Sequence, residues 1–122
     1  MSDELSKLPP NVQERLLRLQ QLQQTLQSIL AQKQQVEMEK TEVEQTLVEL
    51  QKTSEDAVIY KAIGSLLVKA EKPKVTEDLN ERKDLLDTRS TVMAKQEERI
   101  RSQVKEAQTK LQEDLSPVSS SQ

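Results

Sequence analysis

The sequence predicts a mainly α-helical protein, built as a long antiparallel two-helix coiled coil with one β-hairpin at the bend. Two long stretches carry apolar side chains at alternating spacings of three and four residues, which is the heptad pattern of a coiled coil. Between them, two β-prone runs are joined by Gly64-Ser65, which predicts a hairpin. Hydrophobic residues make up only 34% of the chain and Tyr60 is its sole aromatic residue, so a globular core is not expected.

The first helix is expected over about residues 11–53, after Pro9-Pro10. Asn11 is predicted to be its N-cap, with Glu14 as the capping-box partner. Such a long helix needs a partner along its length, and a seam of heptad positions provides the contact. The seam positions are Val12, Leu19, Leu26, Lys33, Lys40 and Leu47 in one series, and Arg15, Leu22, Ile29, Val36, Val43 and Leu50 in the other. We expect the two lysines of the seam to bury their stems and keep their ammonium groups in water.

The hairpin is expected over about residues 57–71, with strands on either side of Gly64-Ser65. Glycine at the first turn position predicts a type II′ turn. Both faces of this hairpin would be partly apolar, and an isolated two-stranded hairpin is marginally stable in water. Because the chain offers no other sheet, we expect another molecule to cover these strands.

The second helix is expected over about residues 76–115, with Thr76 as its N-cap. Its seam positions are Leu79, Leu86, Met93, Ile100 and Ala107, with Lys83, Ser90, Glu97, Val104 and Leu111 beside them. Its exposed faces offer three acid-to-base pairs, Asp78–Arg82, Glu97–Arg101 and Glu106–Lys110. Residues 116–122 are expected to form a frayed tail. Residues 1–122 are thus predicted to form a single domain.

A chain that folds back at Gly64-Ser65 brings the two seams into register. Ile29 then lies opposite Ile100, and Leu26 lies opposite Val104. The same register places Arg15 beside Asp114, which are oppositely charged. The agreement between the turn position and these pairs supports the antiparallel arrangement.

The residue types exclude most chemistry. The chain has no Cys, no His and a single Gly, so a nucleophile–histidine pair, a zinc site and a glycine-rich phosphate loop are all unavailable. Its many carboxylates would be hydrated on an open coiled coil and would lack the burial that tunes catalytic acids. The sequence therefore predicts no enzyme activity, no metal site and no cofactor.

Charge and hydropathy limit the partners and the location. The net charge is −3 and the basic residues are interleaved with acidic ones, so no nucleic-acid partner is expected. The apolar runs are far too short to span a membrane, and the acidic N-terminus lacks the apolar core of a secretory signal. The absence of cysteine suits a reducing compartment, so a cytoplasmic location is expected.

Apolar side chains also gather near the helix ends that lie far from the hairpin. They are Leu8, Val12, Leu16, Leu17, Leu111, Leu115 and Val118. Leu16 and Leu17 are adjacent, so both cannot point into a two-helix seam. Two interpretations stay open. These residues either cap the end of the seam or form a small, mobile apolar surface that touches a partner.

Several segments resemble the β-type subunit of prefoldin, in its archaeal form. The resemblance rests on Leu8-Pro9-Pro10-Asn11-Val12-Gln13, the glutamine-rich residues 19–24, Gln32-Lys33-Gln34, residues 56–61, Gly64, residues 66–69, Arg89 and Gln96-Glu97-Glu98-Arg99. It spans residues 8–115, and the hairpin segment is its most specific part. A single hairpin is typical of the β-type subunit.

This resemblance implies a function without catalysis. Two α-type and four β-type subunits would form a hexamer whose hairpins join into β-barrels. The assembly residues would be Val58, Ile59, Tyr60, Ala62, Ile63, Gly64, Leu66, Leu67 and Val68. The coiled-coil tips, with the apolar residues named above, would hold non-native polypeptides without ATP and deliver them to a group II chaperonin. The alternative is a structural coiled-coil tether or adaptor, which would gain nothing from the hairpin.

Overall fold

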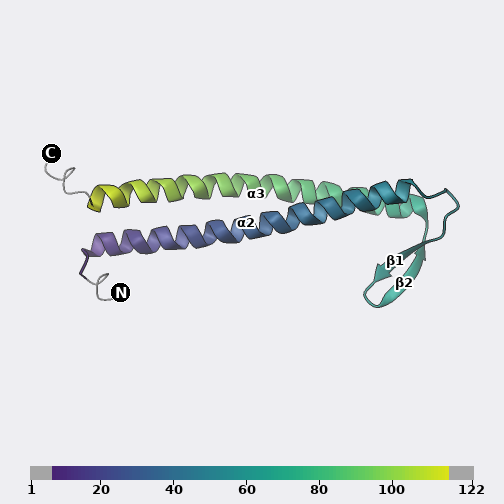
Figure 1. Cartoon of the computed structure of the whole chain (residues 1–122), viewed down its shortest axis with the longest axis horizontal. Coiled ribbons are helices and arrows are strands. Elements are labelled where there is room, and N and C mark those ends of the chain that lie inside the picture. The colour runs from purple at the N-terminus through teal and green to yellow at the C-terminus, as the bar shows by residue number, and fades with distance from the viewer. Residues whose placement is uncertain (1–6, 116–122) are drawn as a thin grey trace. The chain divides into compact units, whose positions relative to one another are not determined.

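The computed structural model describes residues 7–115. Along the chain follow helix α2 (Pro10–Gln51), strands β1 (Ile59–Ile63) and β2 (Leu66–Ala70), and helix α3 (Lys72–Leu115) (Figure 1). The contacts divide the chain into two compact units. The terminal unit joins residues up to Gln32 with residues from Met93 onward, and the hairpin unit is Lys33–Val92. Both helices run through both units, which confirms the predicted fold class of two long helices with one hairpin between them.

An apolar seam holds α2 against α3 within each unit. The buried apolar side chains of the described part all occupy predicted seam positions: Val12, Leu22, Val36, Leu50, Leu86, Ile100, Val104 and Leu111. In the terminal unit, Leu22, Ile100 and Val104 form one cluster, against which Leu26 and Ile29 pack. Later residues of α2 therefore meet earlier residues of α3, and the two helices are antiparallel, as the register predicted.

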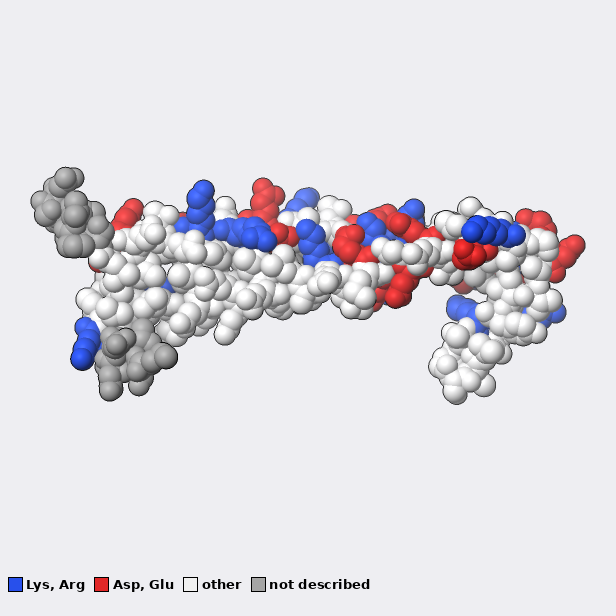
Figure 2. Space-filling view, in the orientation of Figure 1, with Lys and Arg blue, Asp and Glu red and all other residues white. Residues whose placement is uncertain are grey.

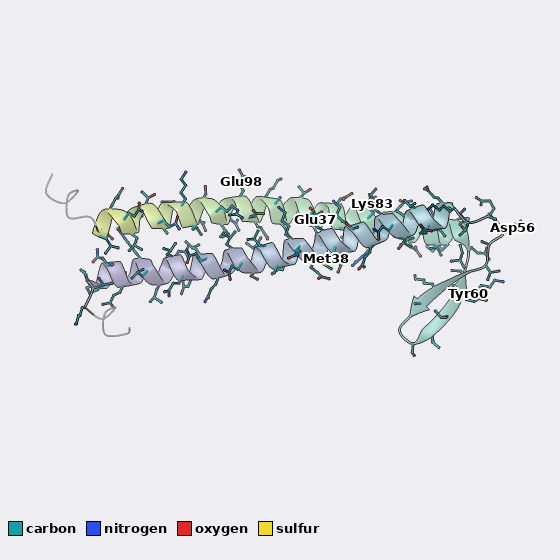
Figure 3. The ribbon with its side chains drawn as sticks, in the orientation of Figure 1. Glu37, Met38, Asp56, Tyr60, Lys83 and Glu98 are labelled. Carbon is teal, nitrogen blue, oxygen red and sulfur yellow. The ribbon has the colours of Figure 1, made fainter. Side chains whose placement is uncertain are left out.

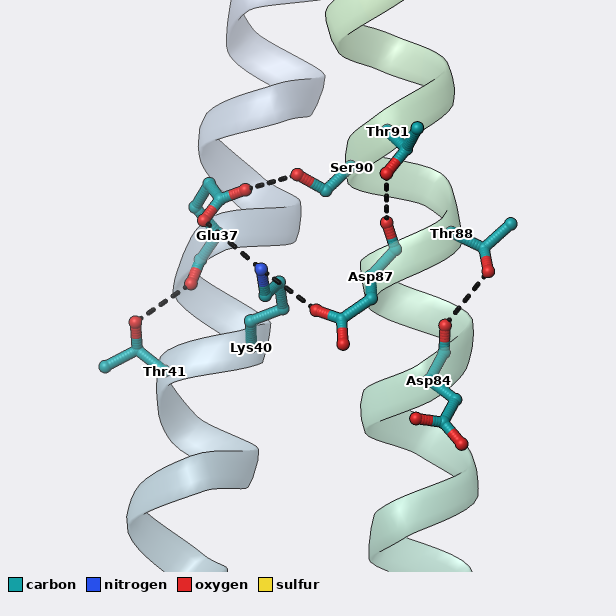
Figure 4. A network of polar contacts seen from close by, with 8 residues as sticks. All are labelled: Glu37, Lys40, Thr41, Asp84, Asp87, Thr88, Ser90 and Thr91. Atoms are coloured by element: carbon teal, nitrogen blue, oxygen red, sulfur yellow. Dashed lines mark hydrogen bonds and ion pairs between the residues drawn. The ribbon is translucent and has the colours of Figure 1, made fainter.

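A layer of polar side chains interrupts the seam in the hairpin unit (Figure 4). The ammonium group of Lys40 lies 3.0 Å from the carboxylate of Asp87 on α3 and 3.9 Å from that of Glu37. The Ser90 hydroxyl donates a 2.6 Å hydrogen bond to Glu37. The hydrogen bond from Lys40 to Asp87 raises the pKa of Lys40 above its ordinary 10.5. The Lys40 head stays accessible to solvent, as predicted, and it also pairs with a carboxylate that the facing helix supplies.

Helix α2 begins one residue earlier than predicted, and Asn11 is not its cap. The backbone N–H groups of Val12 and Gln13 both donate to the carbonyl of Pro9 at 3.0 Å, and the Gln13 side chain donates to Leu8 O at 2.7 Å. Pro10 thus occupies the first helical position, where its missing N–H costs no hydrogen bond and its fixed φ suits the helix. The capping-box prediction was wrong because the two prolines already set the start of the helix.

Helix α3 begins four residues before the predicted N-cap. It starts at Lys72, so Pro73 lies in the first turn, where proline is tolerated. The hydroxyl of Thr76 donates a 2.9 Å hydrogen bond to the Lys72 carbonyl inside the helix. Thr76 is therefore a helical residue and not a cap, which corrects the prediction.

The hairpin has the predicted position and turn. β1 and β2 pair antiparallel, with Ile59 opposite Ala70 and Ile63 opposite Leu66. Gly64 has a φ of +58°, and no other described residue has a positive φ. A positive φ at the first turn position alone is the signature of a type II′ turn. The cross-strand pair of Ile63 and Leu66 directly flanks Gly64-Ser65. A shift in strand register would therefore disrupt this turn.

The exposed ion pairs of α3 follow the prediction in part. Two predicted pairs are present: Arg101 with Glu97 at 2.7 Å and Lys110 with Glu106 at 3.2 Å. The predicted Asp78–Arg82 pair was wrong. Arg82 instead reaches across to Glu39 on α2 at 3.0 Å, and Asp78 pairs with Lys74 at 3.2 Å. The spacing rule for helices considers one helix only, whereas here a second helix lies within reach.

Leu86 gives a direct test of the seam. It is 0% exposed, whereas its neighbour Leu85 is among the exposed apolar side chains. Changing Leu86 to Ala should lower the free energy of unfolding by about 2–5 kcal/mol, because it leaves a cavity between the helices. Leu85→Ala is the matched control and should change stability by less than about 0.5 kcal/mol. Urea unfolding followed by helical circular dichroism measures both. Equal losses for the two variants would contradict the seam.

Candidate assembly and client-binding surfaces

The hairpin presents two different faces. Side chains alternate between the faces along each strand, and directly opposed residues share a face. The isoleucine face consists of Ile59, Lys61, Ile63, Leu66, Val68 and Ala70, and the tyrosine face consists of Tyr60, Ala62, Leu67 and Lys69. Each face thus combines several apolar side chains with one lysine. Both faces are therefore more apolar than a typical solvent-exposed surface.

Most of the hairpin is exposed to solvent. Leu67 is 72% exposed and Leu66 is 66% exposed, and residues 62–68 include no charged side chain. Figure 2 shows this end of the hairpin as an uncharged surface, and Figure 3 shows Tyr60 on β1 away from the helices. In the described part of the chain the sheet has two strands only, so each strand also has a free edge. Unpaired edge N–H and C=O groups can bind a further strand.

The predicted assembly residues are brought together at this one place. The exposed ones are Val58, Tyr60, Ala62, Ile63, Gly64, Leu66, Leu67 and Val68, and Ile59 is half-buried. Fully burying one large apolar side chain, such as Leu66, lowers the free energy by roughly 1.5–3 kcal/mol relative to leaving it in water. Scattered exposed apolar residues are normal on protein surfaces, and Met38, Val48, Leu85 and Val92 are examples here. The hairpin differs because its apolar residues are contiguous on both faces.

The predicted client-binding residues fall into three groups in the terminal unit. Val12 and Leu111 are only 3% and 8% exposed, because they belong to the seam. Leu17 and Leu115 are exposed, whereas Leu8 and Leu16 are half-buried. Val118 lies outside the described residues. The accessible part of the predicted surface is thus smaller than the sequence suggested.

Arg15 links α2 to α3 in the terminal unit. It donates to the carboxylate of Asp114, which confirms the predicted pair, and to the Lys110 carbonyl at 3.2 Å. Beside it lies an open hollow of about 370 Å³. The hollow is lined by Arg15, Arg18, Leu22, Gln103, Glu106, Ala107 and Lys110. The lining thus combines two apolar side chains with four charged ones and one amide.

Two lysines near the hairpin were not predicted to be important. Lys61 on β1 lies 3.7 Å from Asp78 of α3, and Lys72 lies 3.6 Å from Glu55. Asp78 also accepts a hydrogen bond from Lys74, which raises the pKa of Lys74 above its ordinary 10.5. The partners of Lys61 and Lys72 are 17 residues away in the chain. No local spacing rule could have found them.

The described residues offer exposed apolar surfaces. Among residues 7–115 there is no cluster of carboxylates, histidines or cysteines that could hold a metal ion. Neither helix in this part of the chain has an apolar stretch long enough to cross a bilayer. What the arrangement can do is bind: a two-faced apolar hairpin at one place and a few apolar side chains in the other unit. These features define a class of proteins with two long antiparallel helices and one exposed apolar hairpin.

Comparison with known proteins gives this class a family. Residues 13–117 match the family model described as "Prefoldin subunit". Prefoldin subunit beta of Methanothrix thermoacetophila is 46% identical over 109 residues, covering 89% of this chain and 91% of the relative. The corresponding subunit of Archaeoglobus fulgidus is 43% identical, covering 93% and 97%. The crystal structure of the prefoldin beta subunit from Thermococcus strain KS-1 superposes with a TM-score of 0.82 at 37% identity, covering 91% and 97%.

The chain belongs to the prefoldin subunit family. Within it, the sequence and structural relatives named above are all beta subunits, as the single hairpin predicted.

Gly64 allows a test of the hairpin turn. Gly64 has a φ of +58°, and no atom lies within 4 Å of a Cβ added there. A side chain at this position would therefore strain the backbone but would meet no steric clash. Gly64→Ala should destabilise the hairpin by about 1–2 kcal/mol. Hydrogen exchange of the β1 and β2 amides should then accelerate roughly five- to thirtyfold, while the helix amides stay unchanged. Gly64→Asn should destabilise the hairpin less than Gly64→Ala does, because Asn tolerates a positive φ. A Gly64→Ala variant with unaltered exchange would rule out the type II′ turn.

Proposed function

We propose that this chain is a β-type subunit of an ATP-independent holdase chaperone, acting as a single prefoldin-like domain over residues 1–122. Four copies and two α-type subunits form the hexamer. The complex captures non-native polypeptides at its coiled-coil ends and delivers them to a group II chaperonin in the cytoplasm. The chain has no enzymatic role and needs no cofactor.

One observation carries this proposal: an ordered hairpin with both apolar faces and both edges uncovered. Solvating Tyr60, Leu66 and Leu67 is unfavourable, and covering them drives association. Free strand edges favour partners that also bring strands. Other subunits of the same family are the partners proposed here, since the family match over residues 13–117 includes the hairpin. A shared β-barrel satisfies the faces and the edges together.

Client capture is assigned to the terminal unit. Leu17 and Leu115 are its exposed apolar side chains, with the half-buried Leu8 and Leu16 nearby in the chain. A surface this small binds weakly. Several copies acting on one unfolded chain raise the effective concentration, so capture is strong although each contact is weak. Weak single contacts also allow release to a chaperonin without ATP.

The tether or adaptor alternative is less well supported. A coiled-coil tether dimerises through a free seam, but here α3 of the same chain already covers the seam of α2. A tether also has no use for an apolar hairpin, whereas an assembling subunit requires one.

Assembly should depend on both faces of the hairpin. Leu67→Asp on the tyrosine face and Ile63→Asp on the isoleucine face should each abolish complex formation with an α-type prefoldin subunit, because each would bury an unpaired carboxylate. Native mass spectrometry of the mixture measures the assembled mass. Leu85→Asp, an exposed leucine outside the hairpin, is the control and should still assemble. Intact hexamers with Leu67→Asp would show that the hairpin is not the subunit contact.

The exposed leucines of the terminal unit should be needed for client binding but not for assembly. The double variant Leu17→Ser with Leu115→Ser should form the normal complex. It should suppress the aggregation of a denatured protein at least about twofold less well, because small losses at each end multiply across the copies. Light scattering without ATP measures suppression, and Val48→Ser is the control at an exposed site of the hairpin unit. Undiminished suppression would place client binding elsewhere, and loss of assembly would give these leucines a structural role.

A further inference from the structure

The strands of the hairpin extend to one side of the helix ends in the hairpin unit (Figure 1). Their side chains are largely exposed, so apolar packing against the helices does not determine the direction in which the hairpin points. The connections are residues 52–58 on one side and Glu71 on the other. Charged side chains bridge these connections, and they are the contacts that could fix the direction.

Lys72 joins the two chain segments at the base of the hairpin. Its ammonium group donates a 2.9 Å hydrogen bond to the carbonyl of Thr53, just beyond the end of α2, and lies 3.6 Å from Glu55. The side chain is only 12% exposed, unlike an ordinary surface lysine. As the first residue of α3, Lys72 thus ties the segment that enters the hairpin to the segment that leaves it.

Lys61 makes the second link, from the strand itself. Its ammonium group lies 3.7 Å from one carboxylate oxygen of Asp78 on α3. The other oxygen of Asp78 accepts from Lys74, one turn earlier in the same helix, at 3.2 Å. Asp78 therefore pairs with Lys61 through one carboxylate oxygen and with Lys74 through the other. Since Lys61 belongs to the isoleucine face, this link turns that face toward the start of α3.

We propose that Lys72, and Lys61 with Asp78, are positioning residues that fix the direction of the hairpin before the subunit assembles. Two links at different points, one at the base and one on β1, restrict more rotation than either link alone. A free hairpin would have to lose its orientational freedom on docking, which opposes association. A hairpin already held in one direction loses less. The consequence for assembly rests on the proposed function, but the positioning itself does not.

The chain carries its own reporter for this motion. Tyr60 is its sole aromatic residue and lies on β1, so the intrinsic fluorescence of the isolated chain comes from the hairpin alone. Time-resolved anisotropy of Tyr60 then measures how freely the hairpin moves. Lys72→Met and Asp78→Asn should each add a fast component to the anisotropy decay. Asp78→Asn removes the Lys61 link without changing a neighbour of Tyr60, and Lys61→Met should reproduce its effect.

Lys74→Met is the matched control. It removes an ion pair of the same Asp78, but that pair lies within α3 and does not reach the hairpin. Its anisotropy decay should match the unmodified chain. Helical circular dichroism of every variant establishes that the helices are intact. A fast component in Lys74→Met as large as in Asp78→Asn, or no fast component in Lys72→Met and Asp78→Asn, would overturn the proposal.

The second arm measures assembly. With an α-type prefoldin subunit, Lys72→Met and Asp78→Asn should associate roughly two- to tenfold more slowly than Lys74→Met, because the hairpin must be ordered on docking. Stopped-flow light scattering measures this rate. If the unmodified chain fails to assemble, the proposed function fails, and the anisotropy arm alone decides on positioning. If it assembles and all variants associate at the control rate, the positioning role is overturned and the proposed function stands.

Discussion

The packing of α2 against α3 along one apolar seam is the interaction on which the other features depend. Helices α2 and α3, of 42 and 44 residues, gain most of their stability from packing against a partner. Here each is the partner of the other, and their regularly spaced apolar side chains are used in this contact. Because α2 and α3 already bury the seam side chains of each other, contacts with other proteins must use side chains outside the seam.

The hairpin is the main surface of that kind. It has the local features of a stable turn, with Gly64 in the conformation that a type II′ turn requires. Within residues 7–115, however, most side chains of its strands remain exposed. Folding is therefore complete in the helices and incomplete in the hairpin. Physically, this separates two tasks. The seam keeps the chain folded, while Leu66, Leu67 and their neighbours remain available for association.

Polar contacts between the helices and around the hairpin serve orientation more than stability. Exposed ion pairs contribute little free energy, but they select one arrangement among several of similar energy. Lys40 and Asp87 do this inside the seam, where a polar pair disfavours alternative registers. Lys72, through the Thr53 carbonyl, acts at the base of the hairpin. The same principle explains why Arg15 bonds to both Lys110 and Asp114 near the far end of the seam.

The sequence by itself determined the helices, the hairpin, the turn type and the seam, because each depends on local propensity or on a regular spacing. Every buried residue of the described part stands at a predicted seam position. Only the tertiary structure decided which charges meet beside the hairpin. Asp78 was predicted to pair with Arg82, one turn away, and instead lies between Lys74 and Lys61. It also decided that Val12 and Leu111 are buried, whereas Leu17 is exposed. Pairing and exposure depend on side chains that approach from another segment, and sequence spacing along one helix carries no information about them.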